Sequence, residues 1–135
     1  MRSRIRRGVV CGLALLAAGQ ALSQDDPGAR FKKAQEAARA NAASAEGHEW
    51  MERNRFATDR LMILLLNRCL PDPPGDLPTA FAVYVRLSQA GRAREVLTEL
   101  DPSLGKCMTS GARDTPFPEA PRDDYWIEVN MAAPL

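Results

Sequence analysis

Apolar residues follow a helical spacing in the first half of the chain and a two-residue spacing further on. Residues 28–43 are rich in Ala, Lys, Gln, Glu and Arg, and Asp26-Pro27 precedes them as an N-cap and first helical residue would. The composition predicts a helix. Its apolar stripe consists only of Phe31, Ala34 and Ala38, so we expect a solvated or loosely docked helix with a frayed beginning.

A second helix is predicted from Ser44, which offers another N-cap, to Leu70. Trp50, with other apolar residues at helical spacing, predicts a buried face. The run from Leu61 to Leu66 is apolar on every side. We therefore expect the last turns of this helix to be mostly buried, although a buried strand shows the same pattern.

The spacing changes after a connector at residues 70–78, which holds four prolines and therefore forms neither helix nor central strand. In residues 81–87 apolar and other side chains alternate, which predicts a half-buried strand. The segment 88–91 ends in a glycine and predicts a turn, and residues 92–100 are then the returning strand of a hairpin.

A short helix and a last strand complete the pattern. Asp101-Pro102 begins the helix, and Leu104, Cys107 and Met108 lie on one face of it, which we expect to point inward. A proline-rich connector at 115–121 leads to alternating residues at 125–131. The prediction is an α+β fold with a small antiparallel three-stranded sheet (β-β-α-β) packed against helices and preceded by two N-terminal helices.

The length of the chain and the distribution of its charges and apolar residues also predict the cellular compartment of the protein. The 135 residues suit one small domain. Arginines at the start, an apolar run at 8–19 and Ala21-Leu22-Ser23 are typical of a secretory signal peptide, residues 1–23, cleaved after Ser23. Its loss removes four arginines and turns 18 basic against 17 acidic residues into a mildly acidic balance. We expect a periplasmic protein that captures no nucleic acid and has no stable membrane insertion after cleavage.

Two cysteines remain after the predicted cleavage, Cys69 and Cys107, because Cys11 leaves with the signal peptide. In an oxidising compartment an even pair predicts a structural disulfide. The alternative is a reactive thiol or an exchange pair, which needs a lowered pKa, and neither residue has the CxxC neighbour or histidine that lowers it.

Residues for catalysis or metal binding are few. His48 with Glu52 one turn on would offer a cation two ligands, where a metal site needs three or more. Asp123 and Asp124 are adjacent carboxylates on one loop, which rarely face a common atom, so we interpret them as solvated turn residues. We expect no cofactor and no enzyme activity. A small hydrolase, a thiol-redox protein or an inhibitor of a periplasmic enzyme stays as the alternative.

The segment from 69 to 131 resembles the C-terminal domain of TonB- and TolA-like envelope proteins, in its disulfide-bearing variants. The resemblance is carried by a cysteine ending a long helix, the strand 81–87, the turn Gln89-Ala90-Gly91-Arg92, Cys107 on a helix, and Phe117-Pro118-x-x-Pro121 before the final strand. It implies a three-stranded sheet backed by helices, with the last strand at an edge. The domains are then the signal peptide, an Ala-rich helical segment at 24–44 and a TonB-like domain at 45–135.

An edge strand exposes unpaired backbone N–H and C=O groups to which a partner's extended segment can add. The resemblance thereby implies an envelope protein or extended peptide as the partner. The residues expected to bind it are Tyr125, Trp126, Ile127, Glu128 and Val129. The chain departs from energy transducers of that family, which keep a membrane helix and a long proline-rich spacer, so we expect a free-standing module.

Overall fold

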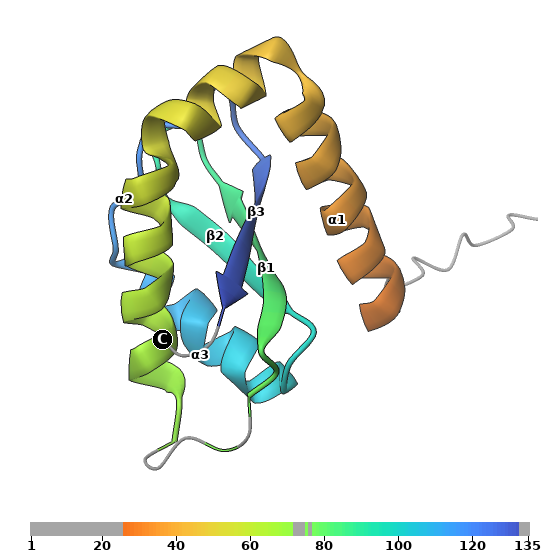
Figure 1. The fold of residues 1–135 in the computed structure, drawn as a ribbon, viewed down its shortest axis with the longest axis vertical. Coiled ribbons are helices and arrows are strands. Elements are labelled where there is room, and N and C mark those ends of the chain that lie inside the picture. The colour runs from red at the N-terminus through yellow and green to blue at the C-terminus, as the bar shows by residue number, and fades with distance from the viewer. Residues whose placement is uncertain (1–25, 72–74, 76, 133–135) are drawn as a thin grey trace, which may run out of the picture.

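A computed structural model describes residues 26–71, 75 and 77–132, and the predicted signal peptide lies outside them. The described elements are α1 (Pro27–Ala43), α2 (Ala45–Cys69), β1 (Ala80–Leu87), β2 (Ala93–Thr98), α3 (Pro102–Arg113) and β3 (Tyr125–Ala132). Figure 1 shows a small sheet with α1 on one side and α2 and α3 on the other. The fold is α+β, as the alternation of the two spacings predicts.

The sheet has the order β2-β1-β3, and both pairs are antiparallel. In the register Val85 lies opposite Val96 on β2 and opposite Ile127 on β3. The β1–β2 register shifts between Arg86 and Leu87, as a β-bulge requires. Both β2 and β3 are consequently edge strands, and in the view of Figure 1 β3 lies between α1 and α2.

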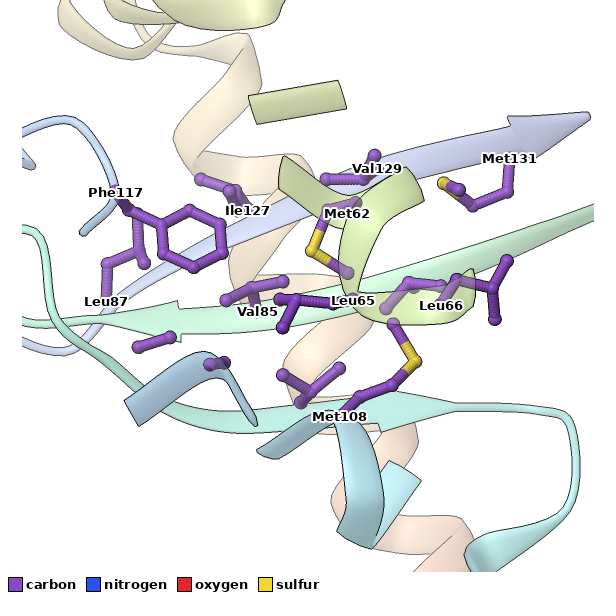
Figure 2. Packing of buried hydrophobic residues seen from close by; sticks show 14 of the residues in the cluster. Met62, Leu65, Leu66, Val85, Leu87, Met108, Phe117, Ile127, Val129 and Met131 are labelled. Atoms are coloured by element: carbon purple, nitrogen blue, oxygen red, sulfur yellow. The ribbon is translucent and has the colours of Figure 1, made fainter. Parts of the chain in front are cut away.

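The main core lies between the sheet and the pair α2 and α3. One face of each strand packs against Met62, Leu65 and Leu66 of α2 and Met108 of α3 (Figure 2). The predicted disulfide joins Cys69 to Cys107, with 5.8 Å between their Cα atoms, and ties the end of α2 to α3. The two helices are thereby held on the same face of the sheet.

Two expectations about this layer are wrong. The run at the end of α2 is buried on one side only, since Ile63 is 36% and Leu64 53% exposed, and Phe56 one to two turns earlier is 81% exposed. The reason is that no described element packs against the back of α2. Cys107 is likewise exposed rather than inward, because it lies at the margin of the face whose centre is Met108.

The Ala-rich helix α1 is docked on the second face of the sheet, where a loosely docked helix was expected. Ala34 and Ala38 are each 2% exposed, and they pack on the fully buried Tyr84. Phe31 meets the Tyr84 ring edge-on at 5.0 Å between centroids. Alanines let the helix backbone approach the sheet closely, so a thin stripe suffices.

The corner between α1 and α2 is short and well determined. Ser44 caps α2, as predicted, by accepting a hydrogen bond at its Oγ from the backbone N–H of Gly47 at 3.0 Å. Gly47 leaves room for the Asn41 carbonyl and the Tyr125 hydroxyl, into both of which a Cβ would intrude. This close approach places the corner against the start of β3.

The second proline-rich connector packs against the hairpin turn. Gly91 has φ +76°, as the predicted turn needs, and its carbonyl accepts a hydrogen bond from Phe117 N at 2.9 Å. Trp50 is buried in the core and donates from Nε1 to the Glu119 carbonyl at 2.6 Å. These contacts set the position at which β3 begins.

Candidate partner-binding edge

Hydrogen bonds at the β2 edge fix which backbone groups of the sheet point outward. The N–H of Val96 donates to Thr109 Oγ1 at 2.9 Å, and its C=O lies 3.3 Å from the same hydroxyl, whose single proton has a nearer acceptor in the Gly105 carbonyl at 2.9 Å. Val96 therefore faces away from β1, and its neighbour Val85 faces β3, because alternate residues of an antiparallel strand bond to opposite sides. Ile127, opposite Val85, then bonds inward to β1.

By the same alternation the backbone groups of Trp126, Glu128 and Asn130 face away from the sheet. An independent contact agrees with this: Asn41 Nδ2 donates to the Trp126 carbonyl at 2.8 Å, from outside β3. The first outward carbonyl of β3 is thus satisfied by α1. Within the described residues no group bonds to the outward N–H and C=O of Glu128 and Asn130.

A groove of about 800 Å³ lies over this part of β3. Its floor is Glu128 and Asn130, one wall comes from the last turns of α1, and the other from the first half of α2. The wall residues are Ala38, Arg39, Ala42, His48, Met51, Glu52, Arg55 and Asp59. Figure 1 shows the three elements that line the groove, β3, α1 and α2.

A hydrogen-bond relay holds Glu128 in the groove floor. Gln35 Nε2 donates to the Tyr84 hydroxyl at 3.1 Å, and that hydroxyl donates to Glu128 Oε2 at 3.0 Å. Arg39 Nε reaches the same carboxylate oxygen at 3.4 Å. Burial, together with the hydrogen bond and negative charge of Glu128, raises the pKa of Tyr84 above its ordinary value of 10.0.

The acidic side chains of the groove walls each lie near a nitrogen of a neighbouring side chain. His48 Nε2 lies 3.3 Å from Glu52, and Arg55 lies 3.8 Å from Asp59. The walls also present the apolar side chains of Ala38, Ala42 and Met51. An occupant would therefore meet backbone hydrogen-bonding groups, small apolar surfaces and charged side chains that mostly have a partner nearby.

The five predicted contact residues are divided between two faces of β3. Tyr125, Ile127 and Val129 are at most 2% exposed and their side chains form core, whereas Trp126 and Glu128 are half-buried on the α1 side. Only this second set has side chains that can reach a partner. The sequence analysis did not find Asn41 or the helical walls. The Ser44 cap marks the corner, but no local signal tells which strand it meets.

The adjacent carboxylates Asp123 and Asp124, considered above as catalytic candidates, make structural contacts instead. Asp123 Oδ1 accepts from the Gln89 N–H at 2.9 Å, and Asp124 lies 3.5 Å from Arg86 and 3.7 Å from Arg94. In the described part of the chain no three His, Cys, Asp or Glu residues are grouped to hold a metal ion. None of the helices described here has the length and apolarity of a membrane span.

Comparison with protein-family models, curated proteins and solved structures finds no match to this chain. The edge must therefore be interpreted from its own geometry.

Proposed function

We propose that this chain is an exported, non-catalytic interaction module of the periplasm, similar to the C-terminal domain of TonB-like proteins, which binds an extended segment of an envelope protein along β3. The observation that carries this proposal is the pair of outward backbone positions at Glu128 and Asn130 on the floor of a groove. An added strand would gain main-chain hydrogen bonds there.

The walls define the kind of segment that fits. Alternate side chains of an added strand would face α1 and α2 in turn. Those facing α1 meet Ala38 and Ala42, and those facing α2 meet Met51. Because the wall charges are mutually paired, a segment of low net charge with medium-sized apolar residues suits the groove better than a strongly charged one.

The two edges of the sheet differ in a way that supports β3 as the binding edge. On β2 the outward N–H of the central residue Val96 is bonded to the Thr109 hydroxyl, which also lies over the Val96 carbonyl. On β3 the first outward carbonyl, that of Trp126, accepts from Asn41, and within the described ranges no other outward group of the strand has a partner. Strand addition at β2 would displace the hydrogen bond from the Val96 N–H to Thr109, whereas at Glu128 and Asn130 it displaces none among the described residues.

The test selects extended ten-residue peptides from a display library and measures their affinity for three variants. Asn130→Pro removes an outward N–H from an edge strand without touching the β1 ladder. We expect it to weaken binding about tenfold or more, while Asn130→Ala, which keeps the N–H, binds within twofold of the parent. Thr98→Pro, at an outward position of β2, is the matched control and leaves affinity unchanged.

Thermal unfolding checks that each variant is folded. Equal affinity of Asn130→Pro and Asn130→Ala in folded protein contradicts strand addition, and so does loss of binding in Thr98→Pro alone.

A further inference from the structure

Two hollows adjoin at the other edge of the sheet, beside β2. The larger, of about 900 Å³, lies between the first turn of α1, the outer edge of β2 and α3. The smaller, of about 340 Å³, lies where β2 begins. Arg113 of α3 lines both of them, so the two hollows lie next to each other at its side chain.

The larger hollow offers a mainly apolar lining. Phe31, Leu97 and Leu100 contribute half-buried side chains to it, and Pro27 and Pro102 lie at its ends. Between Arg94 and Thr98 the strand extends for roughly 13 Å, at about 3.3 Å a residue. An apolar chain of about that length can lie along the edge.

The smaller hollow is basic. It is lined by Arg92, Arg94 and Arg113 together with Ser88. In the described part of the chain no carboxylate lies within ion-pair distance of Arg92 or Arg113, nor of Lys106 on the rim of the larger hollow.

Carboxylates are also present nearby, but most are already paired. Arg94 is 3.8 Å from Asp123 and 3.7 Å from Asp124. Glu95 pairs with Arg30 and Arg86, which leaves Glu99 as the acidic residue of the lining that has no cation beside it within the described residues. The free charge at the junction is therefore positive.

We infer that this edge binds a single-chain amphipathic anion, with an alkyl chain along Leu97 and Leu100 and a phosphate or carboxylate head between Arg92 and Arg113. Guanidinium groups pair with such oxyanions through parallel hydrogen bonds. At the centre of β2 the Val96 N–H is already bonded to the Thr109 hydroxyl, and an alkyl chain laid there needs no backbone partner. The site is separate from the β3 groove.

The experiment titrates dodecyl phosphate, below its micelle concentration, into the isotope-labelled full chain with its disulfide formed, and follows backbone amide resonances. We expect saturable shifts at Leu97, Leu100 and Arg113. The Arg92→Ala/Arg113→Ala variant should bind about tenfold more weakly or worse. Its control, Arg60→Ala/Arg68→Ala, removes two exposed arginines of α2 and should bind within twofold of the parent.

Inorganic phosphate and dodecyl maltoside separate the head from the chain. If both probes bind more weakly than dodecyl phosphate does, the result supports a single site that contacts the head group and the alkyl chain at the same time. The proposal is overturned if either probe binds as tightly as dodecyl phosphate. It is also overturned if the resonance shifts are confined to other elements, or if a folded Arg92→Ala/Arg113→Ala variant binds dodecyl phosphate with unchanged affinity. Asn130→Pro should leave this titration unaltered, which keeps the result independent of the β3 groove.

Discussion

Asn41 of α1 and Trp126 of β3 are joined by a 2.8 Å hydrogen bond from a side-chain amide to a backbone carbonyl. Asn41 is 8% exposed, and its Oδ1 also accepts from Arg122. Asn41→Leu should lower the free energy of unfolding by about 1–3 kcal/mol, because it leaves a buried carbonyl without its donor. Urea unfolding measures this. Asn67→Leu, at an exposed position of α2, is the control and should change it by less than about 0.5 kcal/mol.

Two helical glycines should respond to alanine with opposite signs. At Gly47 a Cβ would lie 2.8 Å from the Tyr125 hydroxyl and collide with the Asn41 carbonyl, so Gly47→Ala should destabilise by about 1–3 kcal/mol. At Gly105 the nearest atoms to a Cβ are 3.5 and 3.6 Å away, and Gly105→Ala should stabilise by about 0.5–1 kcal/mol. Thermal unfolding measures both, and a shift of the same sign in the two would contradict the close packing of the corner.

Neighbouring leucines of α2 should differ in what their truncation costs. Leu66 is fully buried in the core, and Leu66→Ala should cost about 2–5 kcal/mol of unfolding free energy. Leu64 is 53% exposed, and Leu64→Ala should cost less than about 1 kcal/mol. Comparable losses in urea unfolding would mean that the back of α2 is covered in solution.

The disulfide joins residues 38 positions apart. Replacing both of its cysteines, Cys69→Ser/Cys107→Ser, should therefore lower the free energy of unfolding by about 4 kcal/mol, chiefly by loosening the unfolded chain. Peptide binding at β3 should persist in the fraction that stays folded, because neither cysteine lines that groove. Binding lost in protein shown to be folded would instead assign the cysteines a direct role.

Stability should fall at alkaline pH because of Tyr84 and Tyr125. Burial is the main cause that raises the pKa of each phenol above 10.0. Above that pH the unfolded chain loses these protons first, so the free energy of unfolding decreases as pH rises from about 10 through the folded-state pKa. Tyr84→Phe should be less stable at pH 8, where it lacks two hydrogen bonds, and should show a shallower decrease between about pH 9.5 and 11. An unchanged slope would contradict this assignment.

Local chemistry was sufficient to predict the elements of this fold. The cap at Ser44, the cap-and-proline pair at Asp101 and the alternation from Phe81 to Leu87 each depend on residues close in sequence, and each lies where the structure has a boundary or a strand. The pairing of Cys69 with Cys107 followed from counting.

What the sequence left undetermined depends on contacts between distant segments. Whether Leu64 is covered depends on which elements the chain places behind α2, and periodicity alone does not tell. Asn41 meets Trp126 across 85 positions, so a polar residue near a helix end gave no sign of its partner. The groove likewise depends on contacts between distant segments, because its floor on β3 and its walls on α1 and α2 come together only when the corner at Ser44 packs against β3.

The unequal edges of the sheet limit how far an assembly can grow. The outward backbone groups of Glu128 and Asn130 on β3 have no partner among the described residues, whereas at the centre of β2 the Val96 N–H is bonded to a threonine hydroxyl. Repeated head-to-tail stacking of sheets, which produces fibres, needs two receptive borders on every copy. If strands add at β3 alone, as proposed, each complex would stop at one added strand.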